Sequence, residues 1–159
     1  MTKIIFWEEN GVKEVLVQIT EIARLGIAGD KDAQHLARYI LEGLDILKTT
    51  QLPPNQKLQA FFKEDNGDPR TLSITKPFPN NPPLLELRIN RSVPGAFRAI
   101  YFEYDNDDNE KILIFTKSLL KKGDPNPPEL QVKIIESYKI YLEFLKNPKK
   151  YLERSGHVE

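Results

Sequence analysis

The sequence predicts a mixed α+β domain, in which two consecutive helices precede an antiparallel meander of three strands and a further helix follows. Three observations support this prediction. Apolar residues recur at helical spacing in two adjacent segments near the amino end, three β-branched and aromatic segments with short connections come later, and helical spacing then returns. A chain of 159 residues corresponds to one domain at roughly 150 residues per domain. We therefore expect a single domain over residues 1–148 and a carboxyl-terminal tail at 149–159.

The amino-terminal third is predicted to hold a short strand and a helical hairpin. Residues 3–9 are rich in β-branched and aromatic side chains, and an Asn-Gly turn follows them. From Val12 the apolar residues fall at helical spacing, and Gly26 is placed to end this first helix. Asp30 is the candidate N-cap of a second helix. The apolar stripe of that helix comprises Ala33, Leu36, Ala37, Ile40, Leu41, Leu44 and Leu47.

Prolines dominate the segment between residues 52 and 94 and exclude a long helix there. The segment holds eight of the twelve prolines of the chain, at positions 53, 54, 69, 77, 79, 82, 83 and 94. Only short extended pieces are expected within it, at residues 58–62 and 71–74. Three clearer strand patterns come next, at residues 84–90, 96–104 and 111–118. Their short connections favour antiparallel pairing in sequence order.

Helical spacing returns near the carboxyl end. It is carried by the apolar positions Leu130, Ile134, Tyr138, Tyr141, Leu142 and Leu145. Asn147 and Pro148 are expected to end this helix. Residues 151–159 are expected to form a frayed end.

Composition excludes several classes of function. The 23 Lys and Arg residues balance 23 Asp and Glu residues, so any site for a polyanion must be local. The chain has no cysteine, which excludes a disulfide scaffold, and its only histidines, His35 and His157, disfavour a multi-histidine metal site. No apolar run approaches the length of a signal or membrane-spanning segment. We expect a cytoplasmic protein that does not bind membranes and uses neither a metal nor a cofactor.

Five cations at or near the ends of predicted strands are the candidate functional residues: Arg88, Arg98, Lys117, Lys121 and Lys122. If the strands pair in sequence order, the two arginines converge with the lysines that end the third strand. Arginine offers a bidentate fork and lysine a mobile point charge, so such a cluster suits a phosphate group. The spacing also allows a simpler interpretation, with an ion pair from Arg88 to Glu86 or from Arg98 to Glu103 beside a solvated lysine pair.

Four landmarks in this region occur in the order typical of a known family. They are a Leu-Leu-Glu-Leu-Arg strand ending at Arg88, a Phe-Arg-Ala-Ile-Tyr-Phe strand containing Arg98, a third strand followed by a Lys-Lys pair, and Pro127 before a helix. In this order and spacing the chain resembles the RelE/ParE toxin superfamily, especially its HigB-like, phage-derived branch. The resemblance covers residues 84–145, and the strand and two helices before them fit it more loosely.

The resemblance implies a fold and a function. The implied fold is a helical hairpin packed on a small, twisted, mainly antiparallel sheet with a carboxyl-terminal helix. The implied function is that of the toxin in a type II toxin–antitoxin system, a metal-independent endoribonuclease that cuts mRNA on the ribosome and is bound by an antitoxin protein. The alternative is a non-enzymatic protein of the same fold that acts by binding, as a DNA gyrase inhibitor or a phage-derived interaction protein. A homodimer is compatible with either.

The resemblance also implies roles for the five cations. Members of the family cut RNA by attack of a ribose 2'-hydroxyl on the adjacent phosphate, and cationic donors stabilise the charge that develops on the phosphoryl oxygens. A lysine near other cations can act as the base because their charges lower its pKa. We therefore assign Arg98, Lys121 and Lys117 to catalysis, with either lysine as the base, and Arg88 and Lys122 to binding the substrate phosphate.

Overall fold

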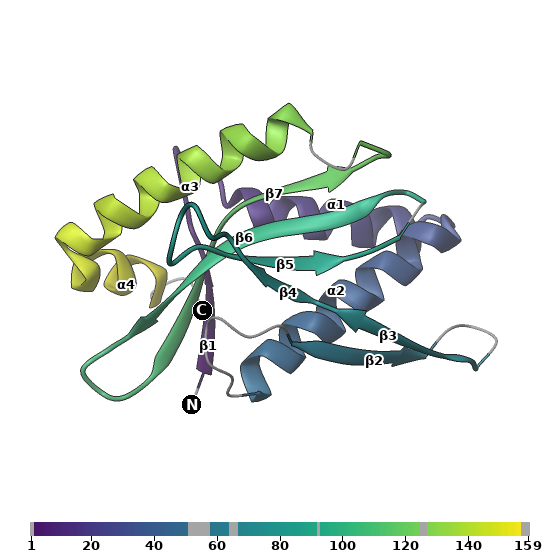
Figure 1. The fold of residues 1–159 in the computed structure, drawn as a ribbon, viewed down its shortest axis with the longest axis horizontal. Coiled ribbons are helices and arrows are strands. Elements are labelled where there is room, and N and C mark those ends of the chain that lie inside the picture. Colours follow the sequence, from purple (N-terminus) through teal and green to yellow (C-terminus); the bar gives the residue numbers. More distant parts are fainter. Residues whose placement is uncertain (1, 51–57, 64–66, 92, 125–126, 157–159) are drawn as a thin grey trace.

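The computed structural model describes residues 2–50, 58–63, 67–91, 93–124 and 127–156 (Figure 1). Its strands are β1 (Thr2–Phe6), β2 (Gln59–Lys63), β3 (Pro69–Ser73), β4 (Thr75–Pro77), β5 (Leu85–Ile89), β6 (Ala96–Asp105) and β7 (Lys111–Lys121). Its helices are α1 (Glu14–Ile27), α2 (Lys31–Thr49), α3 (Pro128–Lys146) and α4 (Pro148–Gly156). The fold is therefore mixed α+β, as the sequence predicts.

A five-stranded sheet forms the centre of the structure. Its strand order is β1-β7-β6-β5-β4, and β2 and β3 form a separate antiparallel pair. The pairs β4–β5, β5–β6 and β6–β7 are antiparallel, which confirms the predicted meander, and β1 joins the edge of β7 in the parallel direction. The two extended pieces expected among the prolines correspond to β2 and β3, whereas β4 was not expected because it contains Pro77.

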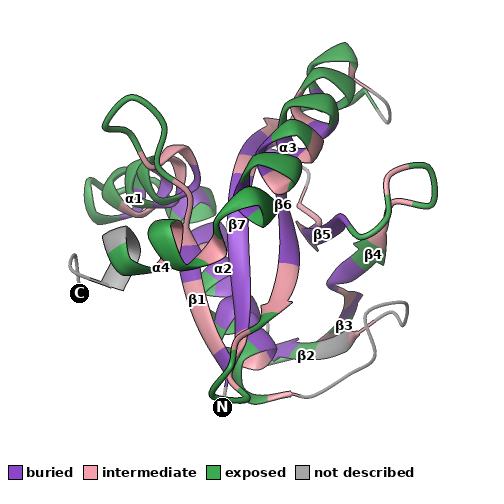
Figure 2. Cartoon of the chain, turned by 90° about the vertical axis from the view of Figure 1, so that its left-hand side faces the viewer, coloured by how far each residue is buried: buried purple, intermediate pink, exposed green. Residues whose placement is uncertain are grey.

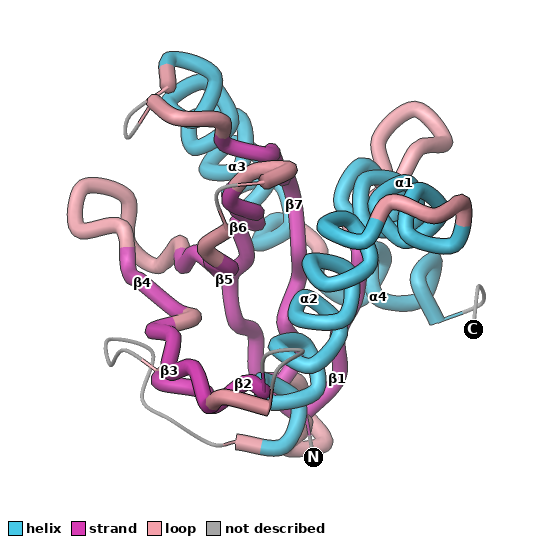
Figure 3. The backbone as a smooth tube through the Cα atoms, turned by 90° about the vertical axis from the view of Figure 1, so that its right-hand side faces the viewer, coloured by secondary structure: helices cyan, strands magenta, loops and turns pink. Residues whose placement is uncertain are grey.

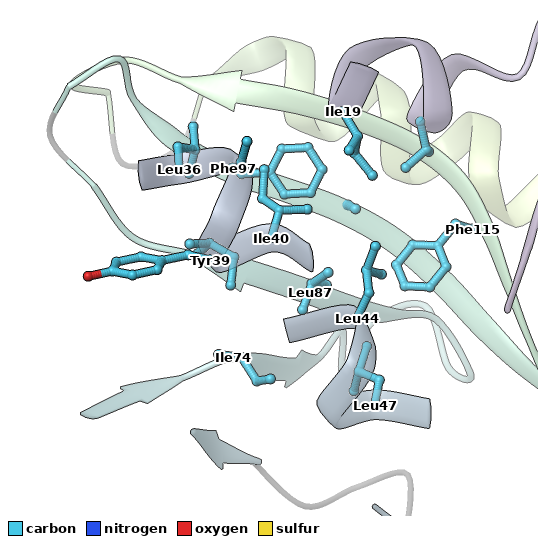
Figure 4. Packing of buried hydrophobic residues seen from close by; sticks show 14 of the residues in the cluster. Ile19, Leu36, Tyr39, Ile40, Leu44, Leu47, Ile74, Leu87, Phe97 and Phe115 are labelled. Atoms are coloured by element: carbon cyan, nitrogen blue, oxygen red, sulfur yellow. The ribbon is translucent and has the colours of Figure 1, made fainter. Parts of the chain in front are cut away.

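Helices cover both faces of this sheet. The hairpin of α1 and α2 lies on one face and α3 on the other (Figure 2). Under the hairpin, Ile40 and Leu44 of α2 approach Leu87, Phe97 and Phe115 of the sheet (Figure 4). On the opposite face, α3 packs on alternate residues of the same strands. Successive side chains of a strand point to opposite faces, so one short run of sequence contributes to both cores.

The helical hairpin is confirmed, but one of its glycines has a different role. The side chain of Asp30 accepts a hydrogen bond from the backbone N–H of Ala33, as an N-cap does. The prediction that Gly26 ends the first helix is wrong, because α1 continues to Ile27. A Cβ atom on Gly26 would lie 2.7 Å from Cα of Gln34. Glycine at this position therefore allows the two helices to approach each other closely.

The carboxyl end contains a helix where a frayed tail was expected. α3 ends at Lys146, before Asn147 and Pro148 as predicted, and the chain then forms α4. The ring of Tyr151 on α4 lies 4.8 Å from that of Trp7, which follows β1, so this helix packs against the rest of the protein. Residues 157–159 lie outside the described part. No helix within the described ranges is both long enough and apolar enough to cross a membrane.

Candidate functional site

Three of the five predicted cations meet at one end of the sheet, where the strands β5 and β7 end and β6 begins. This end lies at the right of Figure 1. Arg88 and Arg98 are direct neighbours across the β5–β6 ladder, and Lys121 pairs with Ala96 across β6–β7. Burial and the charges of Arg98 and Arg88 together lower the pKa of Lys121. The predicted convergence is therefore found for these three side chains.

A hollow of about 520 Å³ opens at this end of the sheet. We call it the arginine hollow. It is lined by Arg70, Asn90, Arg91, Ala96, Arg98, Lys121 and Gly123. Four of these seven residues carry a positive charge and none is a carboxylate. The lining therefore carries charge of one sign, which Glu86 beside Arg98, Asp32 beside Arg91 and Asp124 near Lys121 offset in part. Figure 3 views the structure from this end.

Arg98 is held in one orientation by three partners. Its Nη2 donates to Asn90 Oδ1 at 2.8 Å, its Nη1 donates to the backbone oxygen of Phe97 at 3.0 Å, and its Nε lies 3.8 Å from Glu86 Oε1. The residue is only 4% exposed. Burial lowers the pKa of Arg98, although the charge of Glu86 opposes this effect. Arg98 is thus a preorganised cation at the wall of the hollow.

Glu86 is the buried counter-charge of the arginine pair. Burial raises the pKa of its carboxyl group, and the charges of Arg98, Arg88, Lys76 and Lys121 oppose that rise. The simpler interpretation of the sequence expected Arg98 to pair with Glu103 instead. That expectation is wrong, because Glu103 lies 3.1 Å from Lys111.

Arg88 has unused hydrogen-bonding capacity. Its side chain is half-buried, and its Nε has no hydrogen-bond partner among the residues that the structure describes. Buried donors normally have a partner in a folded protein. Arg88 does not itself line the hollow, so its contribution there is the charge that it places beside Arg98 and Lys121.

Arg70 and Arg91 belong to the hollow but were missed in the sequence. Arg70 Nη2 donates to the backbone oxygen of Asn90 at 2.7 Å. The Arg91 guanidinium lies over the ring of Tyr39, 5.6 Å from its centroid, and its Nη2 is 3.5 Å from Asp32 Oδ1. Both arginines come from short strands or connections without periodicity. The sequence therefore carried no signal that would place them beside Arg98.

Lys117 and Lys122 are not part of the arginine hollow. Lys117 Nζ lies 2.7 Å from Glu9 Oε1 and 3.5 Å from Glu14 Oε1. Burial alone would lower the pKa of Lys117, but the hydrogen bond and charges of these carboxylates outweigh it and raise the pKa. A raised pKa is the opposite of what a general base requires. Lys122 lines a separate hollow between α1 and α3.

The arrangement offers several positively charged donors to one anion. Across the described ranges, no group of three or more His, Cys, Asp or Glu side chains is placed to hold a metal ion. The chain matches no protein-family model, and searches of curated proteins and of solved structures found no similar protein. The geometry of the arginine hollow is therefore the basis for proposing a function.

Proposed function

We propose that this chain is a RelE/ParE-like toxin of a type II toxin–antitoxin system, and that it binds and cuts mRNA on the ribosome at the arginine hollow. The observation that carries the proposal is the set of four cations without a lining carboxylate in a chain of zero net charge. RNA presents a regular row of phosphates, and guanidinium groups bind phosphate with bidentate geometry. The order of a strand, a helical hairpin, antiparallel strands and a further helix agrees with that superfamily.

In the proposed reaction Arg98 and Lys121, which line the hollow, and Arg88, the neighbour of Arg98 on β5, have separate tasks. Arg98 and Arg88 hold the scissile phosphate and stabilise the negative charge that its oxygens gain in the transition state. Lys121 removes the proton of the ribose 2'-hydroxyl, whose oxygen attacks phosphorus as the bond to the 5'-oxygen breaks. The leaving 5'-oxygen takes a proton from solvent, and the products are a 2',3'-cyclic phosphate and a 5'-hydroxyl. The lowered pKa of Lys121 increases the fraction of neutral amine that can accept the proton.

One observation favours a non-enzymatic alternative. Both Nη atoms of Arg98 already donate within the protein, which is typical of a structural arginine as well as of a preorganised one. Under this alternative the hollow would bind without cutting, and the protein would act as a DNA gyrase inhibitor or a phage-derived interaction protein. If the protein is a toxin, an antitoxin would neutralise it by covering the hollow.

Induction in a bacterial host, followed by sequencing of RNA ends, tests the proposal. We expect the wild-type chain to arrest growth and to produce new ends within translated mRNA, and Lys121→Ala to lose both effects at equal protein level. The matched control is Lys139→Ala, an exposed lysine of α3, which should act as wild type. Growth arrest with intact transcripts would instead support a binding protein, and accompanying DNA breaks would indicate gyrase. No effect on growth or transcripts would remove the toxin proposal.

A further inference from the structure

The second half of β7 has an open edge. β1 pairs with β7 only as far as Phe6 opposite Phe115, and the backbone N–H of Trp7 makes the last contact, with Phe115 O at 2.8 Å. β7 itself continues to Lys121 while paired with β6 on its other side. Beyond Phe115, therefore, no strand of the described chain covers this edge, which lies between α1 and α3 (Figure 2).

Backbone groups along this edge point outward. The N–H of Ser118 donates to Glu14 Oε2 at 2.9 Å and so faces away from β6. The N–H and C=O of one residue in a strand point to the same side, and the side alternates from residue to residue. By this rule the C=O of Ser118 and both backbone groups of Leu120 also face the open edge. They are spaced as they would be to receive another strand.

A hollow of about 450 Å³ lies over this edge. We call it the edge groove. Its lining comes from α1, β7 and α3, and includes Val17, Gln18, Ser118, Leu119, Leu120 and Lys133. Val17 is an apolar side chain that is 44% exposed in the groove.

Two buried polar atoms in the edge groove have no partner. Gln18 Oε1 and Ser118 Oγ are both buried and form no hydrogen bond with the described part of the chain. The two residues belong to different elements, α1 and β7, but both line this groove. Unpaired buried polar atoms are rare in folded proteins because each costs free energy. A ligand bound in the groove is one way to supply the missing partners.

We propose that the edge groove binds an extended peptide segment of a partner protein, which joins the sheet as a strand beside β7. The peptide backbone would pair with the C=O of Ser118 and both backbone groups of Leu120, while the Ser118 N–H stays bonded to Glu14. Alternate side chains of the peptide would contact Val17, and its polar groups would satisfy the side chains of Gln18 and Ser118. Three glutamates, Glu14, Glu21 and Glu129, outnumber the two lysines of the lining, Lys122 and Lys133, so the groove has no excess of positive charge to bind a nucleic acid. The inference does not rest on the proposed function, because the arginine hollow is a separate surface.

Peptide backbone chemistry provides a direct test. The probe is the tightest binder selected from a library of eight-residue peptides with apolar residues at alternate positions. Only every second amide of an added strand can donate to β7. We therefore expect N-methylation of one alternate set of amides to weaken binding about tenfold or more, and N-methylation of the other set to change it less than about threefold. Equal effects of the two sets, or a library without binders, would overturn the proposal.

Two variants of α1 locate the binding. Val17→Lys places a charged side chain in the edge groove and is expected to weaken peptide binding about tenfold. The matched control is Leu25→Lys, because Leu25 is 54% exposed on the same helix but does not line the groove. It should bind the peptide as wild type does. Binding should also slow hydrogen exchange at the amide of Leu120. Unchanged binding by Val17→Lys with unchanged exchange at Leu120 would place the peptide elsewhere and contradict the proposal.

Discussion

Arg88 and Arg98 lie directly opposite each other on β5 and β6. Like charges at such a pair destabilise a sheet. The buried carboxylate of Glu86, 3.8 Å from Arg98 Nε, offsets this repulsion within the protein. A phosphate group in the arginine hollow would offset it further, so anion binding and stability should be coupled at this site.

Replacing Glu86 with glutamine tests that coupling. Glu86→Gln leaves Arg98 without its counter-charge, but it also removes the burial cost that raises the pKa of Glu86, so we expect it to lower the free energy of unfolding by at most about 3 kcal/mol. Added inorganic phosphate should restore part of the loss, because it supplies a new counter-charge. Urea denaturation in phosphate and in chloride at equal ionic strength measures both effects.

The control for this experiment is Glu103→Gln. Glu103 pairs with Lys111 in a partly exposed position, so its loss should cost less than about 1 kcal/mol and should not depend on phosphate. If phosphate stabilises both variants equally, the hollow is not the site at which it acts.

Glu14 should make stability depend on pH. Burial would raise its pKa, but hydrogen bonds from Lys133 Nζ and the Ser118 N–H, together with the charges of Lys133 and Lys117, lower the pKa below its ordinary 4.5. A carboxyl group whose pKa is lowered in the folded state stabilises the protein at pH values above the pKa that the group has in the unfolded chain. That stabilisation is lost as the pH falls through the folded pKa. Wild type should therefore lose this contribution in acid.

Comparison with Glu14→Gln isolates the effect of this carboxyl group. We expect wild type to be more stable than the variant by about 2 kcal/mol near pH 7 and the difference to shrink toward zero below the folded pKa. Urea denaturation across this range measures it. The raised pKa of Glu86 acts in the opposite direction but is common to both proteins, so it cancels. A difference that stays constant down to about pH 3 would contradict this role for Glu14.

Two buried helical glycines should respond differently to alanine. A Cβ atom on Gly26 would meet backbone atoms of Gln34 at 2.7 and 2.9 Å, so Gly26→Ala should destabilise the protein by about 1 to 3 kcal/mol. A Cβ atom on Gly43 would meet the end of the Ile89 side chain at 3.3 Å. The gain in helix propensity, about 1 kcal/mol, should then keep Gly43→Ala within about 1 kcal/mol of wild type. Thermal or urea denaturation of the two variants measures this contrast, and equal losses would contradict it.

Local patterns in the sequence predict part of the candidate site. Side chains alternate between the two faces of a strand, and the connections between the strands are short. Together these features place Arg88 beside Arg98 and bring the end of β7 to the same end of the sheet. Lys121 and Lys122 line different hollows, because β7 ends at Lys121 and Lys122 already belongs to the connection that follows it.

Other features depend on contacts that no local pattern reveals. Lys117 is paired by Glu9 and Glu14, which are more than 100 positions away in the chain. Arg70 enters the hollow through its hydrogen bond to Asn90, and it comes from a segment in which prolines remove periodicity. The role of Gly26 likewise depends on how closely two helices pack. Tertiary packing, rather than propensity, determines all three.

Binding of a fluorescent eight-nucleotide single-stranded RNA, measured by anisotropy over a range of salt concentrations, tests the arginine hollow most directly. We expect Lys121→Ala to weaken binding about tenfold at low salt and to reduce the slope of log affinity against log salt by about 0.7, because one phosphate contact is lost. Lys139→Ala should match wild type. Equal affinities and slopes for wild type, Lys121→Ala and Lys139→Ala would contradict the assignment of the hollow as a phosphate site.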